Sequence, residues 1–458
     1  MASTYLSRTQ GTPTNSKKWT ISFWMKGKLT DNNFYSIFGC DFDNGDSCYC
    51  IGSGGQSRNE IGLSEYHGST SYGQGYTDAS LRDSSGWYHI VFSYDSTQAT
   101  ASDRGKTYIN GVFNNSTYAT SIPLNHDSKF NTSGVGIRVG NRSQGGGSAN
   151  YDGCLSHFHF IDGTAYQASD FGQYDANGVW TIKTSPSVTY GTNGFFILKD
   201  GNSVTDQSGN SNNFTVAGGT LTNTEDNPSN VFATFNPLAG YYNGSTFSNG
   251  NNTVVTGTTQ YSYDRATLGA SSGKYYWEIQ YAGRSGGSIP YSLIGISSTQ
   301  PKNTTDFLGK YSYDWAYYVT SSSKIMNAST ETSYGTSYGD NDIIGVAMDL
   351  DNYKLYFSKN GTWQNSGDPT SGSTGTGAIS IVNPSTASYG IDTPLGAYFP
   401  AVSFYDGGVS GTYKANFGNG YFGTTAVSSA GTNASGIGIF EYDVPTGFTA
   451  LSTKGLNL

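Results

Sequence analysis

The sequence predicts an all-β protein built from two antiparallel β-sandwich domains of the jelly-roll type in tandem, followed by a short C-terminal tail. Apolar and polar residues alternate along most hydrophobic stretches, as they do in a strand with one buried face. Glycine supplies 62 of the 458 residues, about twice its usual share, which indicates many tight turns. No segment keeps the i, i+3, i+4, i+7 apolar pattern of an amphipathic helix beyond about two turns.

Composition excludes several classes of protein. Charged residues make up 12% of the chain, against about 25% in an average domain, and the net charge is −9. A basic surface for nucleic acid is therefore not expected. The first residues lack the apolar core of a signal peptide, and no 18 apolar residues run together. We therefore expect no membrane insertion and synthesis in a cytoplasm.

Cysteine usage fits that compartment, because four cysteines are few for a disulfide-held chain of this size. Cys40, Cys48 and Cys50 form a C-x7-C-x-C pattern without a histidine at a zinc spacing. We interpret these residues and Cys154 as reduced thiols in or beside a sheet. A metal or disulfide role is the alternative.

The strand signals fall into two blocks. The first begins with WTISFWMK (19–26) and includes WYHIVFSYD (87–95), and it ends before TNTEDNPSNV (222–231), where alternation stops. The second runs from Thr253 to about residue 422, and a Ser/Gly/Ala linker (426–438) follows it. We therefore expect domains at 1–228 and 229–425, and a tail at 426–458 that docks on a domain.

Three phrases in the first half carry a resemblance to laminin G and concanavalin A-like lectin sandwiches. In that family's order, they are WTISFWMKG, then WYHIVFSYD with KTYINGVFNN, then IRVGNRS with YDGCLSHFHFIDGTAYQASDFG. A fourth phrase, DQSGNSNNFTV from Asp206, is similar to a turn beside the first strand of such sandwiches. Here it comes late, so we expect a late strand to close the first domain.

That resemblance also raises calcium binding, because some laminin G-like turns hold the ion with carboxylate, carbonyl and water oxygens. Two turns offer such ligands: one with Asp206, Ser208 and Asn210, the other with Asp41, Asp43, Asn44 and Asp46. The second is not an EF-hand loop, since its glycine comes one position early and no glutamate follows at the required distance. For both turns the alternative is an Asx-turn that satisfies its own backbone.

The second half resembles the SPRY family. The phrases are GKYYWEIQY, SLIGISS, YSYDWAYY, GDNDIIGVAMDLDNYKLYFSKNGTW, YFPAVSFYDG and YKANFG, ending at Gly418. The resemblance implies a binding module whose loops present a surface to a partner, and a fold without catalytic activity of its own. Trp277 and Trp363 lie in the segments that most strongly resemble the SPRY family, and we expect both to be structural.

The segment KYSYDWAYY, which follows Gly309, gathers aromatic rings around one carboxylate. Rigid rings give contact area at little cost in entropy, so this composition is typical of a recognition patch. The candidate ligand-binding residues are Tyr311, Tyr313, Asp314, Trp315 and Tyr317. For Trp315, core packing is the alternative, because SPRY cores bury aromatic residues in this region.

A catalytic constellation is not apparent. The six glutamates do not form the E-x-D-x-x-E pattern of jelly-roll glucanases. The five histidines form neither an H-E-x-x-H motif nor a pair with a G-x-S-x-G serine. His157 and His159, two apart on one expected strand, leave a metal pair as a minor alternative. We predict a protein that is not an enzyme, with a glycan-degrading enzyme as the lesser alternative.

The whole arrangement resembles virion fibre and appendage proteins of tailed, marine-type bacteriophages, through the phrases YLSRT, DGTAYQASDFG and NPSNVFATFNPL. That resemblance implies a virion location, in a tail or capsid fibre, and homo-oligomers. It also implies other virion proteins as partners and a host cell-surface saccharide as ligand. A cellular surface adhesin or carbohydrate-binding protein is the alternative, and a purely structural, decorating role in the virion is another.

Overall fold

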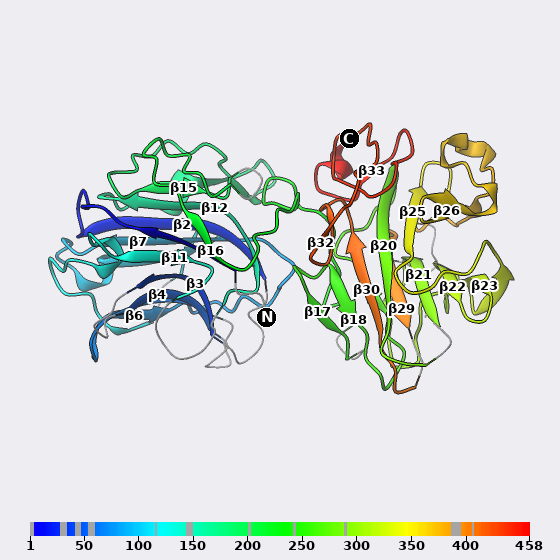
Figure 1. Cartoon of the computed structure of the whole chain (residues 1–458), viewed down its shortest axis with the longest axis horizontal. Coiled ribbons are helices and arrows are strands. Elements are labelled where there is room, and N and C mark those ends of the chain that lie inside the picture. The colour runs from blue at the N-terminus through cyan, green and yellow to red at the C-terminus, as the bar shows by residue number, and fades with distance from the viewer. Residues whose placement is uncertain are drawn as a thin grey trace. The chain divides into compact units, whose positions relative to one another are not determined.

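The computed structural model describes residues 4–27, 34–41, 47–53, 60–114, 117–142, 150–199, 203–240, 244–287, 291–385, 395–404 and 407–458. The chain divides into two compact units, 1–223 and 224–458 (Figure 1). In both units nearly all regular secondary structure of the described residues is antiparallel sheet, which confirms the predicted all-β class.

The boundary between the units lies within the stretch 222–231 where alternation stops, a few residues before the expected end of the first domain. Residues 224–228 belong to the second unit because their hydrogen bonds lie there. The Glu225 amide donates to the carbonyl of Asn419 (3.3 Å), and the Asp226 carboxylate accepts from the amide of Phe232 (3.2 Å).

The first unit contains two large sheets and one small hairpin. Its strands are β1 (Tyr5–Thr9), β2 (Lys18–Gly27), β3 (Phe34–Asp41), β4 (Ser47–Ser53), β5 (Glu60–His67), β6 (Thr70–Tyr76), β7 (Tyr88–Asp95), β8 (Gly105–Ile109), β9 (Val112–Asn114), β10 (Thr117–Thr120), β11 (Gly136–Val139), β12 (Gly153–Asp162), β13 (Gly172–Tyr174), β14 (Trp180–Ile182), β15 (Phe195–Ile197) and β16 (Thr215–Gly218). One sheet has the order β10-β6-β5-β4-β3-β11-β1-β16 and the other β15-β12-β2-β7-β8-β9, while β13 pairs with β14. The expected late strand is β16, which pairs with β1 and thereby ties the end of the unit to its beginning.

Aromatic rings pack the two large sheets against each other. Phe38 of β3 contacts Phe158 and Phe160 of β12, with ring centroids 5.6 and 6.4 Å apart. Strand β2 is buried on both faces rather than one, since Trp24 on its outer face is also covered. A second apolar cluster, which includes Ile161, Phe171 and Trp180, covers this side of the sheet.

The second unit is also built from two large sheets. Its strands are β17 (Thr246–Ser248), β18 (Thr253–Val255), β19 (Asp264–Arg265), β20 (Lys274–Arg284), β21 (Ser292–Ser297), β22 (Asp314–Val319), β23 (Ser323–Asn327), β24 (Thr330–Ser333), β25 (Ile343–Asp349), β26 (Lys354–Lys359), β27 (Thr362–Trp363), β28 (Ile379–Ser380), β29 (Phe399–Phe404), β30 (Gly411–Asn416), β31 (Tyr421–Phe422), β32 (Thr425–Ala426) and β33 (Thr449–Ala450). One sheet follows β17-β18-β30-β20-β25-β26-β27, with β28 on β26 and β33 on β20. The other follows β19-β29-β21-β22-β23-β24, and β31 pairs with β32. Trp277 of β20 is fully buried in the core between the large sheets, as expected of a structural residue.

Helices are few and short. They are η1 (Ala101–Asp103), η2 (Lys129–Asn131), α1 (Ala168–Phe171), η3 (Gln364–Ser366), η4 (Pro369–Thr374) and η5 (Gly455–Asn457). Among the described residues, no helix has the length and apolar character needed to cross a membrane.

The C-terminal tail packs on the second unit, beside β20 (Figure 1). Phe440 meets the ring of Tyr276 edge-on at 5.1 Å, and β33 pairs in parallel with β20. The buried carboxylate of Glu278 on β20 accepts hydrogen bonds from the backbone amides of Glu441 and Tyr442, both at 2.9 Å. One carboxylate therefore fixes the tail to the outer face of a central strand.

Candidate functional site

The structure places the five predicted ligand-binding residues on β22 and in the turn before it. Asp314 and Tyr317 are fully buried. The Asp314 carboxylate accepts a hydrogen bond from Ser297 Oγ (2.9 Å), and burial raises its pKa to about 6. Tyr317 packs against Tyr338 and Phe357. Tyr317 points into the core between the sheets and Asp314 lies on the opposite, covered face of β22, so the predicted ligand contact has no exposed side chain at either position.

Tyr311, Tyr313 and Trp315 are half-buried. Trp315 packs against the main core of the second unit, so for this ring the core alternative describes the structure better. The Tyr311 hydroxyl donates to Asp306 Oδ1 (2.9 Å), and the Lys302 ammonium lies 5.5 Å from the Tyr311 ring centroid. Ligand contact by Tyr311 and Tyr313 stays a prediction.

An open groove lies on the same unit, close to Tyr317. The Tyr317 hydroxyl donates to the carbonyl of Thr336, whose segment forms one wall. The groove has a volume of about 630 Å³ and is lined by Gly335, Thr336, Lys359, Asn360, Thr362, Trp363, Gln364, Asn365 and Ser366. These residues come from the end of β26, from β27 and η3, and from the segment after β24.

The buried side-chain amide of Gln364 links the two walls. Gln364 Oε1 accepts from the backbone N–H of Thr336 (2.9 Å) and from its hydroxyl (3.0 Å). Gln364 Nε2 donates to the carbonyl of Thr362 (2.8 Å). The Lys359 ammonium, on the same side, pairs with Asp342 (3.1 Å). These bonds shape the groove before any ligand arrives, which lowers the entropy lost on binding.

The groove presents one ring and several polar groups without partners. Trp363 is half-buried, held by edge-on contacts with Tyr276 and Tyr356 at 6.4 Å each. Among the described residues, none hydrogen-bonds to Trp363 Nε1 or to the side chains of Thr362, Asn365 and Ser366. These donors and acceptors are therefore free to meet a ligand.

The backbone beneath these groups is held in an unusual conformation. Asn365 and Ser366 both have positive φ, 52° and 55°. Such residues cost on the order of 1 kcal/mol each and concentrate at binding sites. Residues 365 and 366 are exposed, so the strained turn projects its amide and hydroxyl toward solvent.

Sequence reasoning missed this groove. Trp363 was expected to be structural only. In the structure its ring packs partly against a buried apolar cluster and partly forms the wall of the groove. The available signal was the run Asn360 to Ser366, NGTWQNS, in which one indole is flanked by amides and hydroxyls. The partner wall at Gly335 and Thr336 carries no comparable signal.

In the turn at Asp206, N–H and O–H groups surround the carboxylate and donate hydrogen bonds to both of its oxygens. A calcium ion would need oxygen acceptors in these positions. Asp206 Oδ1 accepts from the amides of Phe196 and Ser208, both at 2.8 Å. Oδ2 accepts from the Ser208 hydroxyl (2.7 Å) and the Asn212 amide (2.8 Å). The Asn210 amide nitrogen donates to the carbonyl of Gly194 (2.9 Å). This donor set does not fit a cation, and it matches the Asx-turn alternative.

The other calcium prediction falls outside the described residues: Asp43 and Asp46 entirely, and Asp41, the last residue of β3, in its side chain. The four cysteines are free thiols, and Cys40, Cys48 and Cys50 are buried.

A metal pair of His157 and His159 on β12 was a minor alternative, and the structure gives both side chains other partners. The pairing register of β12 shifts between Ser156 and His159, and His157 has φ +48°, so the simple alternation of side chains is broken. Each Nδ1 lies within hydrogen-bond distance of a hydroxyl: that of Ser156 for His157 (2.8 Å) and that of Tyr190 for His159 (2.9 Å). Burial lowers the pKa of His159 well below its ordinary value.

Comparison with known proteins finds one family model that matches in each half of the chain. Residues 2–169 match the laminin G model of the concanavalin A-like lectin/glucanases superfamily, and residues 274–419 match the SPRY domain model. The first domain is laminin G-like, and the second is a SPRY domain. The groove lies within the SPRY match. Domains of these two kinds are typically non-catalytic binding domains, which suggests a binding or adhesion role. No curated protein matches the chain.

The chain also matches solved structures at low identity. The SPRY domain of human HERC1 is 17% identical, covers 40% of this chain and 96% of its own, and has a TM-score of 0.27. Stonustoxin is 18% identical over 40% of this chain and 27% of its own, with a TM-score of 0.27. A heptameric SAP-like pentraxin from Limulus polyphemus is 18% identical over 36% of this chain and 71% of its own, also with a TM-score of 0.27.

Proposed function

We propose that this chain is a non-enzymatic adhesion protein that binds a saccharide through the groove at Trp363. The observation that carries the proposal is the half-buried indole, rimmed by polar groups that lack partners within the described residues. A sugar ring has apolar faces that stack on an indole, and its hydroxyls pair with amides and hydroxyls such as those of Thr362, Asn365 and Ser366.

The proposed setting is a virion, where the chain would serve as a tail or capsid fibre that attaches to a host-surface saccharide. The segments YLSRT, DGTAYQASDFG and NPSNVFATFNPL, which resemble segments of bacteriophage virion proteins, support this setting. Single contacts of this type are weak, so attachment would depend on several copies of the chain in a homo-oligomer alongside other virion proteins. Detection of the chain in purified particles by mass spectrometry tests this part independently, and its absence from them would contradict it.

A glycan array probed with the purified full-length chain tests the binding part. We expect Trp363→Ala to lower affinity for the saccharide at least tenfold, equivalent to about 1.4 kcal/mol. Trp363→Phe keeps a ring but loses the indole N–H, so its affinity should lie between that of the wild type and that of Trp363→Ala. Asn365→Gly should weaken binding with little change in the melting temperature, because this side chain is exposed and glycine tolerates the positive φ of residue 365.

The double variant Tyr311→Ser/Tyr313→Ser is the matched control, since it removes two half-buried rings outside the groove. It should bind as the wild type does. If only this double variant loses binding, the saccharide site lies on the Tyr311 surface and the groove assignment is wrong. If the wild type binds no saccharide at all, the proposed function is wrong.

A further inference from the structure

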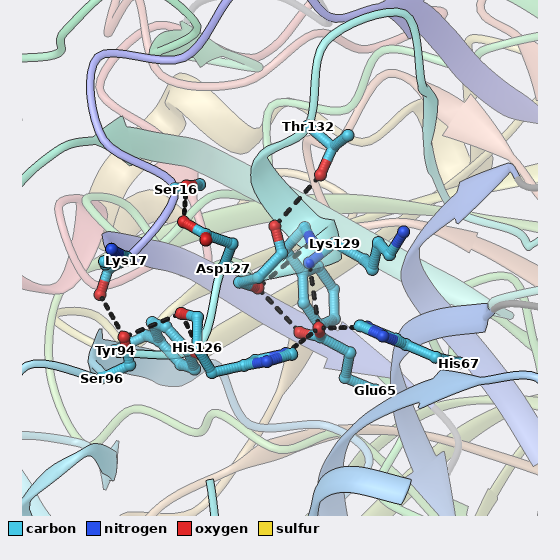
Figure 2. Close-up of polar contacts among 12 residues, drawn as sticks. Ser16, Lys17, Glu65, His67, Tyr94, Ser96, His126, Asp127, Lys129 and Thr132 are labelled. Carbon is cyan, nitrogen blue, oxygen red and sulfur yellow. Dashed lines mark hydrogen bonds and ion pairs between the residues drawn. The ribbon is translucent and has the colours of Figure 1, made fainter. Parts of the chain in front are cut away.

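Three potential metal ligands converge in the laminin G-like domain. Glu65 and His67 lie two apart on β5, so their side chains share a face of the strand. His126 comes from the segment between β10 and η2, far away in sequence. His67 Nε2 lies 3.0 Å from Glu65 Oε1, and His126 Nε2 lies 2.8 Å from the same oxygen. Figure 2 shows both imidazole rings directed at the Glu65 carboxylate.

We propose that Glu65, His67 and His126 bind one Zn²⁺ ion through the carboxylate and the two Nε2 atoms. The three ligand atoms lie within 4.8 Å of one another. Two imidazoles and one carboxylate form a donor set that zinc prefers, whereas calcium takes six to eight oxygens. Tetrahedral zinc with bonds of about 2.0–2.1 Å separates its ligands by about 3.3 Å, so the two N···O distances need only a small expansion.

The carboxylate is already held in place by other groups. Glu65 Oε1 accepts a hydrogen bond from the backbone amide of Lys129 (3.0 Å), and Oε2 accepts from Ser128 Oγ (2.8 Å) (Figure 2). Outer hydrogen bonds of this kind orient a carboxylate ligand and tune its affinity for a metal ion.

The imidazoles are also held in place. The Tyr72 ring stacks on His67 at 4.1 Å and on His126 at 4.8 Å. The β5–β6 pairing shifts register here, with Glu65 opposite Gly73 and Tyr66 opposite Ser71, so Tyr72 is the extra residue of a bulge. The two histidine side chains keep 24% and 10% of their surface exposed, which leaves a path for the ion and room for a fourth ligand.

Zinc binding requires each imidazole to give up its Nε2 proton, because the metal takes the lone pair of that atom. In the metal-free cluster each Nε2 carries the proton that faces Glu65 Oε1. The ion takes the place of these two protons, and each ring then carries its proton on Nδ1, exchanged through water. The resulting site ties the β5–β6 hairpin to the segment 126–129 and stabilises the laminin G-like domain.

Calorimetric titration of the EDTA-treated full-length chain with Zn²⁺ tests the proposal, with Co²⁺ as a spectroscopic probe. We expect one ion per chain and the visible absorption of four-coordinate Co²⁺ without thiolate charge-transfer bands. At a free zinc concentration 100 times the dissociation constant, the zinc-sensitive unfolding transition should move up by roughly 5–10 °C.

His67→Ala removes the most exposed ligand and should weaken zinc binding at least tenfold. Asp127→Asn is the matched control, because this exposed neighbouring carboxylate accepts from Ser16 Oγ and takes no part in the cluster. It should bind zinc as the wild type does. Cys154→Ser removes the half-buried thiol, which is the most accessible of the four cysteines and a competing zinc ligand.

Any of three results would overturn the proposal. The first is no zinc binding by the wild type at micromolar concentrations. The second is binding that survives in the variant His67→Ala/His126→Ala, and the third is binding that disappears in Cys154→Ser. If the histidine variants fail to fold, imidazole ¹⁵N resonances of the wild type decide: zinc must shift the Nε2 signals of two histidines and leave the other three unchanged.

Discussion

Glu278 offers a sharp test of how the tail is attached to the SPRY domain. Its fully buried carboxylate accepts from Tyr276 Oη (3.0 Å), from Asn416 Nδ2 (3.0 Å) and from the two tail amides of Glu441 and Tyr442. Burial raises the pKa of this group to about 7, even though these hydrogen bonds favour the charged form. The perturbation is Glu278→Gln, which keeps the shape of the side chain and removes its titration.

The size of the effect follows from the pKa. Because the folded-state pKa lies above the unfolded value of 4.5, the folded state binds more protons between pH 4.5 and 7. The contribution of this group to stability is therefore complete below pH 4.5 and is lost as the pH rises through about 7. Raising the pKa from 4.5 to about 7 corresponds to about 3 kcal/mol in the free energy of unfolding. The pKa of Asp314 is also raised, so its contribution to stability changes with pH in the same direction. Asp314 is present in both proteins, and its contribution cancels in the comparison.

Urea unfolding at several pH values between 4.5 and 8 measures this difference. Hydrogen exchange in peptides from β20 and β25 reports the unfolding, so that the stability of the SPRY domain is measured separately. The wild type should lose about 3 kcal/mol more than Glu278→Gln between the two ends of this range. Parallel pH dependences for the two proteins would refute the reasoning, since they would mean that Glu278 does not titrate with a raised pKa.

The remaining predictions concern packing and one histidine. Trp277→Ala should destabilise the SPRY domain by about 3–5 kcal/mol, and Trp363→Ala by about 1 kcal/mol, because only the first ring is fully buried; equal losses in urea unfolding would contradict this. Gly295→Ala should cost at least 1–3 kcal/mol or prevent folding, since its Cβ would lie 1.9 Å from the carbonyl oxygen of Trp315; an unchanged melting temperature would count against the β21–β22 pairing. Burial lowers the pKa of His89 to about 3, so its contribution to stability is present above pH 6.5 and is lost as the pH falls toward 3. The laminin G-like domain should accordingly lose about 2 kcal/mol from His89 between pH 7 and pH 5, and a loss that persists undiminished in His89→Gln would exclude this origin.

The strand pairs could be predicted from the sequence because their signals are local. In the segment 343–358, alternation and a tight turn specify one hairpin, and the structure pairs Val346 with Phe357 across it. The burial of Tyr317 and Asp314 could not be predicted in the same way. The two residues lie on opposite faces of β22, and both faces are covered by segments distant in sequence, which the alternation along one strand does not reveal.

Both candidate sites depend on residues that only folding brings together. Gln364 clamps Thr336, which lies 28 positions earlier, and Glu65 meets His126, which lies 61 positions later. Neither pair has a characteristic spacing, so no motif could reveal it. The second buried face of β2 has the same cause, because residues beyond Ile161 cover it.

The most direct test of saccharide binding at the groove is fluorine NMR of the full-length chain labelled with 5-fluorotryptophan. The seven tryptophans give separate signals, and the Trp363 signal is assigned by its absence in Trp363→Phe. Titration with the best saccharide from the glycan array should shift the Trp363 signal and leave that of fully buried Trp277 unchanged. A Trp363 signal that stays in place while the saccharide binds would contradict the proposed site.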